Sequence, residues 1–355
     1  MIESTSSDID IQKAKHSKIH AVDFDNLLFG RVFTDHMFVC DFIDNVWQKP
    51  QILPYGPMSF DPSARVFHYG QAVFEGMKAY KDEQGDIFMF RPQQNFERIN
   101  KSAERLAMPA FPKDYFFNGL KALLELEKDW IKVGLGKTLY LRPFVIATEP
   151  AISASPSNQY RFMIICSPAA AYYAGEVRVL FAEKFSRSAD GGVGFAKAAG
   201  NYAAQFYPTE LAKENGFNQI IWTDANSHEY LEEAGTMNIF FRVNDTLLTA
   251  PNNDRILDGV TRKSVLQLAK DYNIKHEVRR VSVKEIKEAA RNGSLKEIFG
   301  TGTAAVINPI AAFKHGEDVF ELPKQDDAYA SFFKDKLTKI QHNLTEDPHG
   351  WRYKI

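Results

Sequence analysis

The order of hydrophobic and polar positions predicts a chain that mixes strands with helices throughout. Apolar runs rich in aromatic and β-branched residues predict strands at 32–39, 47–54, 66–69, 72–80, 87–90, 139–146, 161–166, 177–180, 220–222, 238–243, 247–250 and 278–281. Apolar residues that recur every three or four positions predict helices at 96–106, 115–133, 201–215, 260–272, 282–291 and 330–343. The two kinds of element do not alternate strictly, so the pattern favours an α+β fold over a doubly wound α/β sheet.

Local signals set some of the boundaries. Ser282 with Glu285 forms a capping box at a helix start, and Asn244–Asp245 predicts the turn of a hairpin. Pro208 predicts a kink or a new first turn within the helix expected at 201–215.

The length of 355 residues suggests two domains, each large enough for a core of its own. Residues 1–20 are polar and mixed in charge, which is typical of a loosely attached tail. We expect a small first domain over 21–174, a connecting segment over 175–184 and a larger second domain over 185–355, with the cofactor site described below in the second.

Composition excludes several classes of function. With a net charge of −2 and no run of Lys and Arg long enough to follow a phosphate backbone, nucleic-acid binding is not expected. The two cysteines, Cys40 and Cys166, are far apart and show no CxxC spacing, so neither a disulfide framework nor a metal site is expected. No secretory leader is visible, and the longest mostly apolar run, 162–174, is too short to cross a bilayer. The sequence therefore predicts a cytoplasmic protein.

One lysine stands in a glycine-rich stretch, 191–202. Glycine allows close backbone approach. The small apolar neighbours of Lys197 are expected to shield it partly from water, which favours the neutral, nucleophilic form of its amine. Such an amine forms Schiff bases with carbonyl compounds or with pyridoxal phosphate. A surface lysine in a flexible loop is the alternative reading of the stretch taken alone.

Two turns could hold a phosphate, although the chain lacks dinucleotide and nucleoside-triphosphate motifs. Residues 258–261 put free N–H groups at a predicted helix start, and residues 300–304 form a turn with backbone and hydroxyl donors. Arg91, at a predicted strand end, could add a fixed cation.

Carboxylates at 232 and 233 enter an otherwise apolar stretch, which is unusual unless they are paired. A carboxylate near the pyridine nitrogen is what a pyridoxal ring needs to act as an electron sink. Tyr202 could bond the phenolic oxygen of that ring. Aromatic residues that would suit a small apolar side chain, together with one arginine that could bind a carboxylate, are Phe29, Tyr69, Phe74, Tyr140, Tyr172 and Arg142.

Taken together, these stretches resemble the branched-chain amino acid aminotransferases, which are pyridoxal phosphate (PLP) enzymes of fold type IV. The matching stretches are 32–37, 74–80, 90–92, 139–143, 191–202, 233–238, 257–262 and 299–304. They occur in family order over nearly the whole chain, from about residue 25 to 345. The resemblance implies a small N-terminal α+β domain and a larger C-terminal domain with a β-barrel-like core.

The resemblance also implies the roles of single residues. Lys197 carries PLP as an internal aldimine and moves the substrate proton, Glu233 faces the pyridine nitrogen, and Arg142 grips the distal carboxylate of glutamate. The implied cofactor-binding residues are Arg91, Lys197, Tyr202, Glu233, Val260, Thr261 and Thr303. The implied substrate-binding residues are Phe29, Tyr69, Phe74, Tyr140, Arg142, Tyr172, Thr236, Thr303 and Ala304.

Family members are homodimers, and the resemblance implies that Tyr69 completes the pocket of the neighbouring subunit. Some animal members carry a redox CxxC pair after the Thr–Ala turn, where this chain has Ala305 and Asn308, so that regulation is not expected.

The predicted reaction is ping-pong transfer of the amino group between leucine, isoleucine or valine and 2-oxoglutarate. The alternatives are a D-amino acid aminotransferase or an aminodeoxychorismate lyase of the same fold, or a PLP- or phosphate-binding protein without catalysis.

Overall fold

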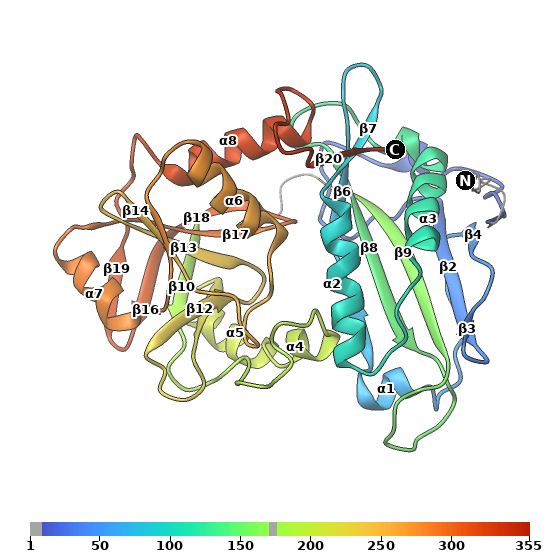
Figure 1. The fold of residues 1–355 in the computed structure, drawn as a ribbon, viewed down its shortest axis with the longest axis horizontal. Helices are drawn as coiled ribbons and strands as arrows, with labels where there is room; N and C mark the ends of the chain where they lie inside the picture. The colour runs from blue at the N-terminus through green and yellow to red at the C-terminus, as the bar shows by residue number, and fades with distance from the viewer. Residues whose placement is uncertain (1–8, 170–175) are drawn as a thin grey trace. The chain divides into compact units, whose positions relative to one another are not determined.

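The computed structural model describes residues 9–169 and 176–355, and its contacts divide the chain into two units (Figure 1). The first unit holds the described residues up to 169 together with Ala196–Ala199 and Lys339–Ile355, and the second holds the rest. Each unit has its own sheet and its own hydrophobic core, so each is described by itself.

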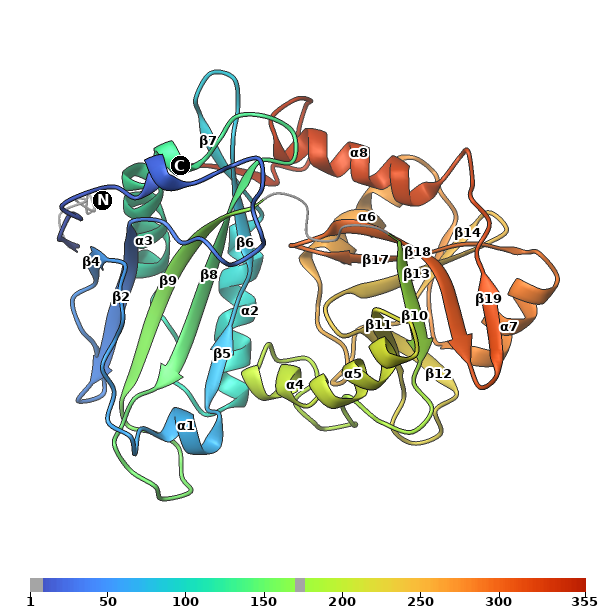
Figure 2. The same ribbon diagram turned by 180° about the vertical axis from the view of Figure 1, so that it is seen from behind.

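The first unit is built on one ten-stranded sheet. Its strands are β1 (Asp10–Ile11), β2 (His36–Ile43), β3 (Val46–Trp47), β4 (Gln51–Pro54), β5 (Ala72–Phe74), β6 (Met77–Lys81), β7 (Ile87–Phe90), β8 (Thr138–Ala147), β9 (Tyr160–Ala169) and β20 (Arg352–Lys354). They lie in the order β1-β4-β2-β9-β8-β6-β7-β20, with β3 beside β2 and β5 beside β8. The helices are η1 (Ile19–Ala21), α1 (Arg65–Tyr69), α2 (Pro92–Arg105), α3 (Lys113–Leu126) and η2 (Lys128–Trp130). Figures 1 and 2 show α2 and α3 along one face of this sheet.

The core between this sheet and its helices is aromatic. Phe111 stacks on Phe162 with 3.7 Å between ring centres, and Phe38 meets both rings edge-on. Gly119 on α3 allows this packing, because a Cβ there would lie 2.4 Å from the Phe38 ring. The packed core supports β8 and β9, which pair over their whole length.

The second unit contains a ten-stranded sheet that closes on itself. Its strands are β10 (Val177–Phe181), β11 (Gln219–Thr223), β12 (Tyr230–Ala234), β13 (Asn238–Val243), β14 (Thr246–Thr249), β15 (His276–Val278), β16 (Val281–Ser282), β17 (Leu295–Gly302), β18 (Val306–His315) and β19 (Asp318–Glu321). The order β13-β17-β18-β10-β11-β12 is closed by a pairing of β12 with β13, which makes a six-stranded barrel. The later helices of the chain are α4 (Ala199–Ala203), α5 (Phe206–Glu214), α6 (Val260–Asp271), α7 (Val283–Arg291) and α8 (Tyr329–Gln341).

The architecture confirms the predicted fold class, an α+β chain with a barrel-like core in its C-terminal half. Local signals are confirmed as well. The β13–β14 hairpin turns at Asn244, whose φ is 50°, and the backbone N–H of Glu285 donates to Ser282 Oγ at 3.0 Å, as the capping box requires.

Some predicted elements are wrong. Residues 66–69, read as a strand, lie in α1, which ends where Gly70 takes a left-handed conformation that stops the helix. The single helix expected at 201–215 is two helices, α4 and α5, but Pro208 does lie in a new first turn, that of α5, which is one of the two outcomes predicted for it. The strand predicted at 177–180 is the barrel strand β10, which lies within the segment 175–184.

None of the helices in residues 9–169 and 176–355 combines the length and apolarity that crossing a membrane requires.

Candidate active site

The segment around Lys197 lies on the sheet of the first unit. The backbone N–H of Phe74, on β5, donates to the Lys197 carbonyl at 3.0 Å. Ala198 forms an antiparallel β-bridge with Val73 of the same strand. The amine of Lys197 lies 4.7 Å from the centre of the Phe74 ring. These contacts group Ala196–Ala199 with the first unit, whereas the sequence had assigned 185–355 to the second domain.

The predicted pocket residues of the first unit meet around that phenylalanine. The Arg142 guanidinium lies 4.6 Å from the centre of the Phe74 ring, and its Nη2 donates to the Tyr140 hydroxyl at 3.2 Å. Phe29 meets the Tyr140 ring edge-on at 4.9 Å between centres. The structure therefore brings Lys197, Phe74, Tyr140, Arg142 and Phe29 together.

Gly76 leaves the room that the Tyr140 hydroxyl occupies. A Cβ at position 76 would lie 2.1 Å from Tyr140 Oη and 2.9 Å from Cζ, a distance that real atoms do not adopt. Tyr140 is only 8% exposed, so its ring has little space in which to move away.

We therefore expect Gly76→Ala to displace Tyr140 and its bond to Arg142, and to lower kcat/KM about 10-fold to 100-fold in both half-reactions, because sub-ångström errors in a site are costly. The matched control is Gly56→Ala, since a Cβ at 56 meets nothing within 4 Å and should leave activity unchanged. Steady-state kinetics of both variants make the comparison, and equal activities would contradict the expectation.

Two other predicted residues of the first unit occupy separate places. Arg91 stands between β7 and α2 with a φ of 51°, an unusual conformation for a residue with a side chain, and its guanidinium lies 5.0 Å from the Trp351 ring centre. Tyr69 ends α1, is 46% exposed, and donates its hydroxyl to the carbonyl of Ile152. Tyr172 lies outside the described residues.

In the second unit, Glu233 on β12 is buried and held by three donors. Its Oε1 accepts from the backbone N–H of Leu257 at 3.1 Å and pairs with Arg187 at 3.0 Å, while Oε2 accepts from Asn238 at 2.9 Å. Arg187 also donates to the carbonyl of Gly194, in the glycine-rich stretch. These donors fix the direction of the carboxyl.

The start of α6 carries backbone N–H groups that lack an intrahelical partner. The first N–H groups of a helix have no intrahelical partner, and no side chain caps the start of this helix, which includes Val260 and Thr261. Gly259 packs so closely that a Cβ there would lie 1.8 Å from Asn238 Oδ1. Asn238 thus links Glu233 to the start of α6. The backbone N–H groups at this helix start fit a phosphate.

The remaining predicted residues of this unit lie in turns and in α4. Thr236 occupies the β12–β13 turn, and Thr303 with Ala304 occupies the β17–β18 turn. These two turns are in contact, because a Cβ at Gly302 would lie 3.1 Å from the carbonyl oxygen of Thr236. Tyr202 lies in α4.

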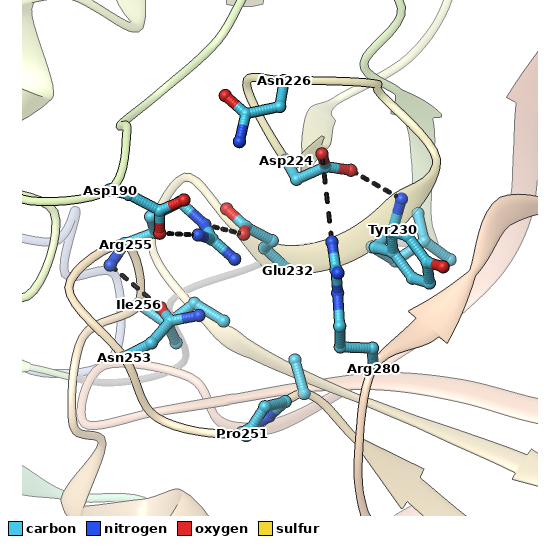
Figure 3. A pocket seen from close by; sticks show the side chains of 12 residues that line it. Asp190, Asp224, Asn226, Tyr230, Glu232, Pro251, Asn253, Arg255, Ile256 and Arg280 are labelled. Atoms are coloured by element: carbon cyan, nitrogen blue, oxygen red, sulfur yellow. Dashed lines mark hydrogen bonds and ion pairs between the residues drawn. The ribbon is translucent and has the colours of Figure 1, made fainter.

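A polar hollow of about 190 Å³ lies in the same unit (Figure 3). Figure 3 shows the Arg255 side chain between Asp190 and Glu232, with which it forms ion pairs, while Arg280 points to Asp224 at 4.0 Å. Burial raises the pKa of the Glu232 carboxyl, and the Arg255 guanidinium acts against that shift. The charges of the hollow are thus paired with one another.

Contacts of the residues that line this hollow fix the loop before α6. Neighbouring strand residues point to opposite faces, so Glu232 binds the Arg255 side chain while Glu233 accepts from the backbone of Leu257. The carbonyl of Arg255 in turn accepts from Arg187 at 2.7 Å. Glu232 and Glu233 therefore both hold this loop, and Glu233 is also part of the candidate site.

Sequence reasoning missed the partners of these residues. Arg187, Asn238 and Ser102, which accepts from the backbone N–H of Lys197, had not been singled out as functional. Their signal was weak: each is a polar residue that the fold buries, and burial depends on contacts far along the chain.

Comparison with known proteins agrees with this geometry. Residues 72–313 match the family model described as amino-transferase class IV. The branched-chain-amino-acid transaminase 1 of Bacillus subtilis is 42% identical over 339 residues, covering 94% of this chain and 95% of that protein. The branched-chain-amino-acid aminotransferase of Mycolicibacterium smegmatis is 41% identical and covers 92% of each chain. A crystal structure of the branched-chain aminotransferase of Thermoproteus uzoniensis superposes with a TM-score of 0.74 at 22% identity, covering 90% of this chain and 99% of that chain, and shares the fold.

A match over more than half of the chain defines a class IV aminotransferase, an enzyme that depends on PLP. Within that class, the chain belongs to the branched-chain-amino-acid aminotransferase family.

Proposed function

We propose that this enzyme transfers the amino group of L-leucine, L-isoleucine or L-valine to 2-oxoglutarate, giving the branched 2-oxo acid and L-glutamate in a ping-pong cycle. The observation that supports this most is the placing of the Lys197 amine and the Arg142 guanidinium against one Phe74 ring. An apolar wall beside the Arg142 guanidinium suits both a branched aliphatic side chain and the distal carboxylate of glutamate. The names of the relatives point to the same substrates.

The cofactor-binding residues remain part of this proposal. Lys197 would hold PLP covalently, and Glu233 and Tyr202 would face its ring nitrogen and its phenolic oxygen. The residues assigned to its phosphate are Arg91, Val260, Thr261 and Thr303. The donors at the start of α6 and the fixed carboxylate of Glu233 fit these assignments. When bound, PLP supplies an electron sink for the bonds at the substrate Cα.

The protein's own groups then have distinct tasks. The Lys197 amine would take the proton from the Cα of the donor amino acid in the first half-reaction and deliver a proton to the Cα of the acceptor 2-oxo acid in the second. The Thr303–Ala304 turn, with Tyr69 of the partner subunit, would bind the α-carboxylate. The described residues assigned to the side-chain pocket are Phe29, Phe74, Tyr140 and Thr236, and Tyr172 is assigned to it from the sequence.

Arg142→Ala should separate the two substrates. Loss of a carboxylate-binding guanidinium raises KM for glutamate and 2-oxoglutarate about 10-fold to 100-fold, while KM for leucine, which has no second carboxylate, changes little. Arg161→Ala is the matched control, because Arg161 on β9 pairs with Asp41 instead. Equal losses for leucine and glutamate in Arg142→Ala would contradict the role.

A substrate panel tests the function itself. The PLP-loaded protein is assayed with L-leucine, L-isoleucine, L-valine, D-alanine and aminodeoxychorismate, with 2-oxoglutarate as acceptor. We expect turnover of the branched L-amino acids only. Turnover of D-alanine, or release of pyruvate from aminodeoxychorismate, would indicate the alternative enzymes, and bound PLP without turnover would indicate a binding protein.

We also propose a homodimer in the cytoplasm. Exposed apolar side chains on α1 and the loop bonded to it support an interface: Phe67 is 60% exposed and Ile152 68% exposed. Light scattering after size exclusion is expected to give about twice 40.3 kDa. Both cysteines are buried free thiols, which agrees with a reducing compartment.

A further inference from the structure

Helix α2 presents a buried polar stripe to the segment that carries Lys197. Asn95, Arg98 and Ser102 are spaced by three and four residues, so they share one face of the helix. Asn95 is 3% exposed and Ser102 1%, and the Arg98 side chain is 10% exposed. Buried polar side chains are costly unless each has a partner, so their contacts show what the stripe holds in place.

Ser102 contacts the lysine directly. The backbone N–H of Lys197 donates to Ser102 Oγ at 2.9 Å, and the backbone N–H of Phe74 donates to the Lys197 carbonyl at 3.0 Å. Both backbone polar groups of Lys197 are therefore bonded within the first unit, one to a helix and one to a strand.

The same helix face also anchors that strand. Arg98 binds both carboxylate oxygens of Glu75, at 2.7 and 2.9 Å, and Asn95 donates to one of them at 2.8 Å. Burial acts to raise the pKa of the Glu75 carboxyl, but the Arg98 guanidinium holds it below its usual value, so this pair stays ionised. Glu75 directly follows Phe74, whose N–H bonds the Lys197 carbonyl. By holding Glu75, the stripe therefore also holds the end of the strand that bonds Lys197.

We propose that Ser102 is a positioning residue of the reaction: its hydroxyl fixes the Lys197 backbone so that the amine points at the reacting carbon. The proposal rests on the function proposed above. Ser102 acts through Lys197, because its contact is with the lysine backbone. It should therefore affect steps that need the amine and leave substrate affinity alone.

The test compares Ser102→Ala with Ser157→Ala. Ser157 is the matched control: it is 6% exposed in the same unit, and its hydroxyl donates to the carbonyl of Gln159. The first readout is capture of added PLP by cofactor-free protein, followed by borohydride reduction and mass spectrometry of the peptide that contains residue 197. In this capture the amine and the aldehyde form one C=N bond and release one water, and hydride then reduces that bond. The second readout is kcat and KM for leucine.

For Ser102→Ala we expect capture and kcat to fall about 10-fold, with KM for leucine changed less than about twofold, because a misplaced amine loses orientation but not substrate contacts. Ser157→Ala should match the natural protein in both readouts. If Ser102→Ala does not fold, Ser102→Cys replaces it, since the thiol is only slightly larger than the hydroxyl but its sulfur is a weak acceptor, and the same losses are expected.

The outcomes separate the two proposals. Natural protein that captures no PLP at residue 197 contradicts the proposed function, and with it this inference. Natural protein that does capture PLP, beside a Ser102 variant with unchanged capture and kcat, overturns the positioning role alone. An equal loss in Ser157→Ala also overturns it, because the effect would then follow from any lost buried hydroxyl.

Discussion

Lys197→Ala should abolish transamination, with kcat lowered by about five orders of magnitude or more, as removal of a group that forms the covalent bond and moves the proton generally does. The protein should also lose the PLP adduct at residue 197 after borohydride reduction. Lys197 is the one lysine of the glycine-rich stretch 191–202.

The control for this change is Lys213→Ala. Lys213 lies on α5 and pairs with Glu210 in an exposed ion pair, which contributes little to stability. Its loss should leave rate and adduct unchanged. A Lys197→Ala enzyme that transaminates leucine at the natural rate would refute the assignment.

Glu233→Gln is expected to lower kcat about 1000-fold, because an amide cannot supply the negative charge that keeps the ring nitrogen of the cofactor protonated. The variant also leaves Arg187 buried without its carboxylate, so thermal unfolding should occur at lower temperature. Stopped-flow absorbance of the loaded enzyme with leucine measures the first effect, and a melting curve measures the second.

The neighbouring residue supplies the control. Glu232→Gln removes a buried carboxylate from the same strand, but this one pairs with Arg255 on the opposite face. We expect it to lower stability in the same direction while kcat stays within about threefold. If both variants lost activity equally, the loss in Glu233→Gln would reflect general damage to β12 and would not support a role at the ring.

Elements with local causes could be predicted from the sequence. The hairpin at Asn244, the capping box at Ser282 and the helix α6 each depend on residues close together in the chain. Residues 66–69 misled the prediction because their aromatic composition favours a strand, whereas the left-handed Gly70 and the contacts of α1 favour one helical turn. Closure of the barrel by β12 and β13 came only from the resemblance.

The candidate site shows the same limit. Lys197, Glu233 and Arg142 stand out because each is a polar or charged residue in an apolar or glycine-rich setting. Ser102 and Arg187 do not, because their importance follows from partners far along the chain: Ser102 lies 95 residues before the lysine whose N–H it accepts. The spacing of residues in a sequence does not reveal such long-range pairs.

The pairing of β20 with β7 has a consequence for how the protein is made. The second unit separates these two strands in the chain, so the first sheet cannot be completed until that unit has been synthesised. The segment that carries Lys197 also joins the first unit late, after β10. During synthesis the N-terminal part of the sheet therefore has β7 as an edge strand whose outer side is unpaired. A nascent chain with such an edge is prone to association and is a substrate for chaperones.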